Sequence, residues 1–184
     1  MAFLVGYAIL AYNSMVGTVE SVSNAWSLLD VELRRRHDLI PELERVVSAN
    51  RDYEAAVQTE LATLRSLQAH DLPEHSSDQA VARFDPEMRS EWQALRSVFA
   101  KAEAYPHLSA QPAFSALQQE LVNTESRIEM ARHFYNNSVG IVRDRSQVFP
   151  GVLVAWLAEV DTSAEFTELA DGDPAEAPPA AAWT

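Results

Sequence analysis

Apolar residues recur along the first half of this chain in alternating steps of four and three. The sixteen positions of this repeat, twelve of them apolar, are Met15, Val19, Val22, Trp26, Leu29, Leu33, Arg36, Ile40, Leu43, Val47, Asn50, Glu54, Val57, Leu61, Leu64 and Gln68. A mean spacing of about 3.5 residues keeps one stripe of side chains facing a partner helix, whereas a strand needs a spacing of about two. The repeat therefore predicts long helical structure that packs as a coiled coil.

The same spacing returns twice farther along the chain. A short repeat comprises Met88, Trp92, Leu95, Phe99 and Ala102, and a long one comprises Phe114, Leu117, Leu121, Thr124, Ile128, Ala131, Tyr135, Ser138 and Val142. The tripeptide Asp85-Pro86-Glu87 is typical of a helix start, because Asp caps the first turn and Pro fits its first position. Pro106 ends this helix by residue 105, and Pro150 ends the next one near residue 149.

Prolines and polar stretches interrupt the pattern at three places. Pro41 lies inside the first repeat, where it removes a backbone hydrogen bond and is predicted to kink or break the helix near residues 36–38. Residues 69–84 hold Pro73 and two serines and predict a loop, as does the sequence PHLSAQP at 106–112. The sequence VLVAWLAEV at 152–160 predicts a short apolar helix that covers one end of the bundle.

Two long helices, one or two shorter ones and no strand pattern predict an all-α fold, an antiparallel helical bundle. We place this bundle at residues 13–166. Residues 167–184 contain acids, alanines and prolines with little to bury, and we predict an acidic disordered tail there. Trp26, Trp92 and Tyr135 lie on the repeats and are predicted to be core residues.

The chain starts with an uncharged apolar run, AFLVGYAILAY, within residues 1–12. A helix through this run would be roughly 17 Å long, whereas the hydrocarbon core of a bilayer is about 30 Å thick. Two interpretations stay open: an anchor-like segment that forms part of a membrane span, or the apolar end of a core helix. The run lacks the basic flank and the cleavage site of a signal peptide.

Composition narrows the classes of function. Twenty-seven acids against fourteen bases give a net charge of −13, which disfavours binding to nucleic acid. The absence of cysteine excludes disulfides, thiolate catalysis and cysteine-based metal sites. None of the five histidines belongs to an H-E-x-x-H or E-x-x-H motif, and no phosphate-binding loop occurs. We therefore expect no catalytic residue, no metal and no cofactor.

Residues 34–38, RRRHD, form the densest charged block, and Arg36 falls on the repeat. In an antiparallel bundle the sequence TESRI at 124–128 lies opposite this block. The candidate polar network comprises Arg34, Arg36, His37, Asp38, Glu125, Arg127 and Arg132. One hypothesis is a buried ion-pair network that fixes the register of the helices. The other is a polar pocket with an arginine-bound anion, formed where the proline frees backbone groups.

Several short motifs occur together in one order. They are Tyr12-Asn13, Ala25-Trp26-Ser27, Asp30-Val31, RRRHDLIPEL at 34–43, Tyr105-Pro106, LQQEL at 117–121, TESRI at 124–128, Ala131-Arg132, Tyr135-Asn136 and Phe149-Pro150. With these motifs the chain resembles the LemA family of membrane-anchored helical proteins. The resemblance implies a helical bundle behind a single N-terminal membrane span, in a family without an established biochemical activity. Glu42, where the family usually has Asn, and Asp52-Tyr53-Glu54, where a His-Glu pair is usual, depart from its pattern.

These observations predict a membrane-anchored, non-enzymatic scaffold or adaptor, with the membrane as a partner through residues 1–12. Its protein partners are unknown, its side of the membrane is not indicated, and self-association stays open. The alternative is a bundle, enzymatic or not, that binds a small ligand or anion through Arg36, His37 and Glu125. A third hypothesis is a soluble cytoplasmic bundle whose apolar start packs on itself.

Overall fold

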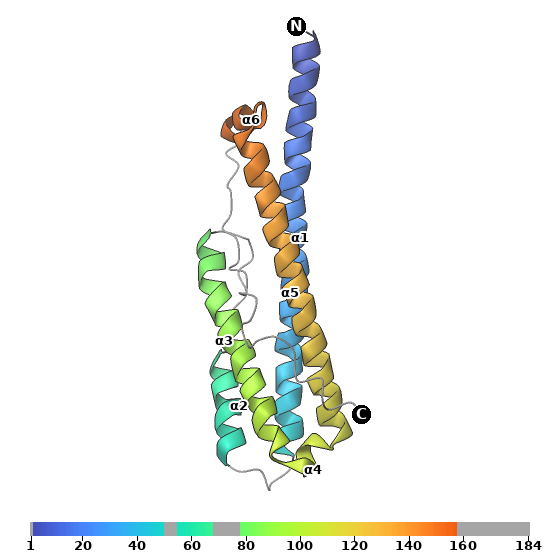
Figure 1. Ribbon diagram of the computed structural model, residues 1–184, viewed down its shortest axis with the longest axis vertical. Helices are drawn as coiled ribbons and strands as arrows, with labels where there is room; N and C mark the ends of the chain where they lie inside the picture. Colours follow the sequence, from blue (N-terminus) through green and yellow to red (C-terminus); the bar gives the residue numbers. More distant parts are fainter. Residues whose placement is uncertain (1, 50–54, 68–77, 158–184) are drawn as a thin grey trace.

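The computed structural model describes residues 2–49, 55–67 and 78–157 (Figure 1). Within these ranges the chain is helical and contains no strand. The helices are α1 (Ala2–Ser48), α2 (Ala55–Leu67), α3 (Asp78–Glu103), α4 (Pro106–Ser109), α5 (Pro112–Gln147) and α6 (Gly151–Leu157). The predicted all-α class with two long helices is confirmed.

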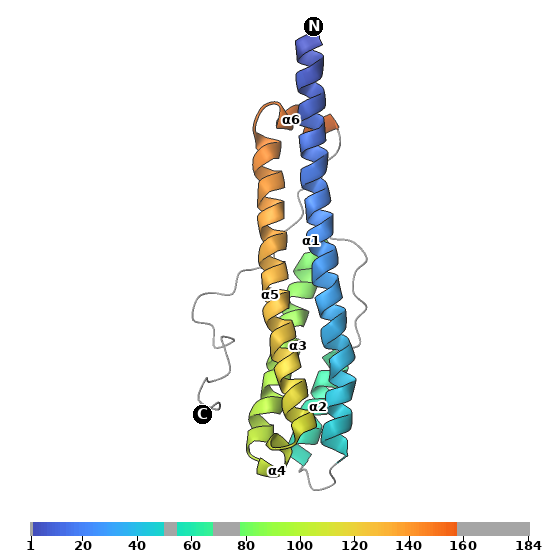
Figure 2. The ribbon, with the colours of Figure 1, turned by 90° about the vertical axis from the view of Figure 1, so that its right-hand side faces the viewer.

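The two long helices, α1 and α5, run antiparallel and lie side by side along most of their length (Figures 1 and 2). Helices α2 and α3 pack on this pair at the end far from the N-terminus, and α4 turns the chain from α3 into α5. At the opposite end α6 folds against α1. The bundle is therefore wide at one end and consists mainly of α1, α5 and α6 at the other.

Burial along α1 and α5 follows the predicted repeats. All nine predicted positions on α5 are buried, and so are the positions on α1 from Val22 to Val47. Val19 is the exception, because Thr18 takes the inward position of that turn. The Thr18 hydroxyl is satisfied there, since it donates a hydrogen bond of 2.8 Å to the Ser14 carbonyl oxygen. On α2, Val57, Leu61 and Leu64 are buried as predicted, while Asn50, Glu54 and Gln68 lie outside the described residues.

Pro41 does not break the first helix, contrary to the sequence-based prediction. Helix α1 continues through Pro41 to Ser48. Pro41 and His37 are both exposed, so the His37 carbonyl, to which proline cannot donate, lies on the solvent side of the helix, where water can reach it. Ile40 and Leu43 are fully buried on the opposite side and hold the helix against the core.

The predicted start of α3 at Asp85 is also wrong. The helix begins at Asp78, inside the predicted loop, and continues through Pro86. Val81, Asp85 and Met88 point inward at steps of four and three, so their packing extends the helix toward its N-terminus. The PHLSAQP segment likewise contains the one-turn helix α4 rather than only a loop, and residues 68–77 lie outside the described part.

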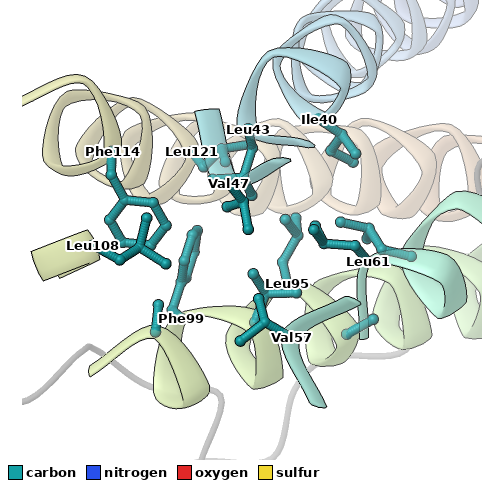
Figure 3. Packing of buried hydrophobic residues seen from close by; sticks show 14 residues of the cluster. Ile40, Leu43, Val47, Val57, Leu61, Leu95, Phe99, Leu108, Phe114 and Leu121 are labelled. Carbon is teal, nitrogen blue, oxygen red and sulfur yellow. The ribbon is translucent and has the colours of Figure 1, made fainter. Parts of the chain in front are cut away.

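Buried apolar side chains form two clusters. The wide-end cluster has members on each of the five helices from α1 through α5 (Figure 3). It includes Ile40, Leu43, Val47, Val57, Leu61, Leu95, Phe99, Leu108, Phe114 and Leu121. The middle cluster comprises Val22, Ala25, Trp26, Leu29, Leu33, Val81, Met88, Ile128, Ala131, Tyr135, Val139 and Val142. Each contains an aromatic contact: the Phe99 and Phe114 ring centroids are 6.3 Å apart, and those of Trp26 and Tyr135 are 5.5 Å apart. Trp92, predicted to be core, is half-buried beside the wide-end cluster.

The apolar start of α1 extends past the rest of the bundle (Figures 1 and 2). Its side chains Tyr7, Ile9, Leu10 and Tyr12 are 50–70% exposed. This exposure excludes the interpretation of these four residues as the apolar end of a core helix. Among the described residues, no helix offers an apolar stretch that would reach across a bilayer.

Two glycines give opposite predictions for the same substitution. A Cβ on Gly151 would lie 1.9 Å from the Arg145 carbonyl oxygen, whereas a Cβ on Gly140 meets nothing within 4 Å. We expect Gly151→Ala to lower the free energy of unfolding by about 1–3 kcal/mol, because the turn between α5 and α6 must open. Gly140→Ala, inside α5, should raise it by about 0.5–1 kcal/mol, because alanine loses less backbone entropy in a helix. Urea unfolding of both variants tests the pair, and equal effects would contradict it.

Candidate functional site

Arg36 lies at the centre of the bundle, on the inward face of α1. The residue is only 1% exposed although it carries a charge. Its Nη1 donates a hydrogen bond of 2.9 Å to Glu125 Oε2 on α5, and its Nη2 donates one of 2.5 Å to Glu91 Oε2 on α3. Its Nε is buried and has no hydrogen-bond partner in the described part of the chain. One guanidinium thus joins three helices through two carboxylates.

We call Arg36, Glu91 and Glu125 the polar layer, because they separate the two apolar clusters. On α1 the layer falls between Leu33 of the middle cluster and Ile40 of the wide-end cluster. On α3 and α5 it falls in the same way, between Met88 and Leu95 and between Ile128 and Leu121. Sliding any of these helices by one turn would bury a charge among apolar side chains. The layer therefore specifies the register in which the helices pair.

A second buried ion pair joins α3 and α5 near the layer. Arg132 Nη2 donates a hydrogen bond of 2.7 Å to Asp85 Oδ1. Arg89, one turn farther along α3, lies 3.3 Å from the other oxygen of the same carboxylate. Both Asp85 and Arg132 are buried, so each charge depends on the other for compensation.

Loss of contact with water is the largest cause of the pKa shifts of Glu125 and Arg132. Burial raises the pKa of Glu125 above its ordinary value of 4.5, although the charges of Arg36 and Arg132 oppose this effect. The negative charge of Glu91 raises the Glu125 pKa further. Burial also lowers the pKa of Arg132, and the nearby Asp85 opposes that change. In both residues the charged form loses contact with water, which is why it is disfavoured.

The raised pKa of Glu125 predicts a pH dependence of stability with a defined sign. The folded chain binds a proton at Glu125 at a pH where the unfolded chain has not yet done so. The contribution of this group to the free energy of unfolding therefore grows as pH falls from above its folded pKa toward 4.5, and is lost as pH rises. Urea unfolding from pH 7 downward should show a smaller gain on acidification for Glu125→Gln than for the unmodified chain. Parallel curves would contradict the assignment.

The other predicted residues lie outside the polar layer. Arg127 Nε lies 3.1 Å from Glu32 on α1, and its side chain is partly exposed. Arg34 lies 2.9 Å from Asp30 of its own helix and is largely exposed. His37 and Asp38 are exposed as well. The prediction grouped Arg34, His37 and Asp38 with Arg36 by sequence proximity, but successive helical residues point about 100° apart, so within residues 34–38 only Arg36 faces the core.

Glu91 and Asp85 were missed by the sequence analysis. A usable signal was present, because Asp85, Met88, Glu91 and Leu95 follow one another in steps of three and four. The prediction placed Trp92 on the repeat instead of Glu91, which is one residue earlier. It also treated Asp85 as a helix cap and therefore not as a core residue. Among the described ranges, no three His, Asp or Glu side chains come together in a way that could hold a metal ion.

A model of the LemA family matches residues 25–180 of the sequence. The chain belongs to the LemA family. The match includes Arg36, Glu91, Glu125, Asp85 and Arg132, so both buried ion-pair groups of this LemA protein lie within the family region. Among curated proteins, the comparison finds no match to the chain.

Proposed function

We propose that this LemA protein is a non-enzymatic scaffold that attaches to a membrane at the uncharged end of its bundle. The charge distribution at that end carries the proposal. No charged residue precedes Glu20 on α1, and residues 146–157 contain none either. Arg145 marks the boundary, because its Nη1 donates hydrogen bonds to the Ser14 carbonyl oxygen at 3.2 Å and to Thr18 Oγ1 at 2.6 Å.

The exposed apolar side chains beyond this boundary suit a lipid surface. Moving Ile9 and Leu10 from water into hydrocarbon is favourable by about 25 cal/mol for each Å² removed from water. Tyr7 and Tyr12 have the amphipathic rings that favour the boundary between lipid and water. The acidic remainder of the chain, with its net charge of −13, stays hydrated and is repelled by anionic lipid, so neutral lipid is the expected surface.

Exposed apolar side chains on α1 and α5 support the scaffold part of the proposal. Leu28 and Val31 on α1 and Met130 and Phe134 on α5 are all exposed. The ion pair between Glu32 and Arg127 places these two groups at one level of the bundle. Several exposed apolar side chains in one region are typical of a surface that binds another protein. A partner helix or a second copy of the chain would cover it.

The geometry of the polar layer favours the scaffold over an anion-binding role. Two Arg36 nitrogens already bind carboxylates that belong to the chain itself. An incoming anion would have to displace Glu91 or Glu125 and leave that carboxylate buried without a partner. Such a displacement costs several kcal/mol, so we assign the layer to holding the bundle together.

Flotation with phosphatidylcholine vesicles tests the membrane attachment. The unmodified chain is expected to float with the vesicles, and Ile9→Asp/Leu10→Asp to remain at the bottom of the gradient. Each new charge costs about 2.5–3.5 kcal/mol in hydrocarbon, which corresponds to roughly 60-fold to 300-fold weaker binding for each substitution. The matched control is Met130→Asp, an equally exposed apolar position in the middle of α5, which should float normally. Recovery of the unmodified chain away from the vesicles would refute the attachment.

A further inference from the structure

We propose that α6, together with Val148 and Phe149 in the turn that leads into it, forms a second membrane contact beside the apolar start of α1. This inference rests on the membrane attachment proposed above. It gives this segment a different role from the one that the sequence pattern predicted, and the family match assigns it none. The expected partner is the head-group region of a neutral bilayer.

The first observation is the exposure of this segment. Val148, Phe149, Val152 and Leu153 are 44–72% exposed. The sequence pattern predicted that this helix covers the end of the bundle, and the helix is present, but these four side chains point mostly to solvent. Single exposed apolar residues are common in proteins, whereas four within six positions require a partner.

The second observation is the position of the segment. Helix α6 packs against α1 near its N-terminal end, and the apolar start of α1 continues past it (Figures 1 and 2). Arg145 contacts Ser14 and Thr18, and the chain leaves α5 two residues later. Phe149 therefore lies on the side of Arg145 that faces away from the wide end of the bundle. The same direction leads from Ser14 to the exposed Tyr12, so both apolar segments lie at the same end of the bundle.

The third observation is the arrangement of charge around that end of the bundle. No charged residue occurs between Arg145 and Glu159 in the sequence. Arg143 and Arg145 lie in the last turns of α5, at the depth where the phosphates of a bilayer would be, and Asp144 and Glu20 at the same end offset their charge. This balance favours a zwitterionic surface over an anionic one. A protein partner would need no such continuous uncharged end, so lipid is the occupant that the observations favour.

The length of α6 decides how it meets the bilayer. Seven residues of helix are far too short to span, because a transmembrane helix needs about 20. The segment therefore lies in the interface, with its apolar side chains at the boundary between head groups and acyl chains. Together with α1 it gives two separate contacts. Two contacts restrain the rotation of the bundle about α1, which one anchoring helix leaves free.

Site-specific fluorescence tests this inference on the full chain. Because the protein has no cysteine, single cysteines can carry an environment-sensitive dye such as nitrobenzoxadiazole. We would label Val152→Cys on α6, Leu10→Cys on α1 and His133→Cys, an exposed control in the middle of α5. With phosphatidylcholine vesicles the emission of the first two should shift to shorter wavelength, and that of the control should not.

The outcomes separate the two proposals. A shift at residue 10 without one at residue 152 overturns the α6 contact and leaves the attachment through α1 intact. No shift at either residue overturns both. A shift at residue 152 alone supports the lipid contact of α6 and refutes the proposed role of α1.

A second pair of variants excludes a general effect of surface hydrophobicity. Phe149→Ser/Leu153→Ser should weaken partitioning into the vesicles about tenfold for each side chain removed. Met130→Ser/Phe134→Ser removes comparable exposed apolar surface from the middle of α5 and should leave partitioning unchanged. All four positions are exposed, so circular dichroism should show both variants folded. Equal loss in the two variants would overturn the inference.

Discussion

Replacing Arg36 with methionine is expected to lower the free energy of unfolding by about 3–5 kcal/mol, the usual effect of breaking a buried ion pair from one side. Methionine fills much of the volume but removes the guanidinium to which the largely buried Glu91 and Glu125 are both hydrogen-bonded. For a chain of this length the loss corresponds to a fall in melting temperature of roughly 10 °C. Thermal and urea unfolding followed by circular dichroism would measure it.

Arg34→Met provides the matched control for this prediction. Arg34 belongs to the same charged block, but its side chain is largely exposed and its ion pair is with Asp30 of its own helix. Its replacement should change stability by no more than about 0.5 kcal/mol. Adding Glu91→Gln and Glu125→Gln to Arg36→Met should recover part of the loss, because no buried charge then remains unpaired. Equal stabilities of the two single variants would refute the structural role of the polar layer.

Asp85→Ala is expected to have the second largest effect, again about 3–5 kcal/mol. The substitution removes the carboxylate that the buried Arg132 and the neighbouring Arg89 both contact. The size of the loss separates two interpretations of Asp85. If Asp85 only capped a helix, its replacement would cost about 1 kcal/mol.

The control for Asp85 is Asp38→Ala, an exposed acid on α1. Removing it should change the free energy of unfolding by no more than about 0.5 kcal/mol. Both variants lose one carboxylate, so a difference between them measures burial and pairing rather than net charge. A loss near 1 kcal/mol for Asp85→Ala would show that Arg132 finds compensation elsewhere.

The two buried ion-pair groups explain how so long a bundle holds one alignment. Apolar stripes alone allow α1 and α5 to slide by a turn with little loss, because leucine packs against leucine in several registers. Arg36 between Glu91 and Glu125 makes every other register costly. The scaffold that we propose would need such a unique alignment, since its exposed side chains would have to keep fixed positions relative to one another and to the membrane.

The sequence by itself determined the helical class, the presence and antiparallel arrangement of the two long helices, and nearly all of the positions that face inward on them. It did so because the steps of four and three record which side of a helix meets the core, from Val22 to Val47 and from Phe114 to Val142. It also placed Arg36 in the core and TESRI opposite it, since both follow from the same repeat and an antiparallel pairing.

Only the tertiary structure decided which carboxylates bind Arg36 and where sequence rules for helix starts and proline breaks do not hold. Glu91 comes from a third helix whose register cannot be read from α1 and α5, and Asp85 is a core residue because Arg132 faces it. Pro41 stays within α1 because packing of Ile40 and Leu43 outweighs the lost hydrogen bond. The exposure of Val152 and Leu153 on α6 also depends on how the helices pack. An apolar sequence favours burial, but it does not indicate which surface buries it.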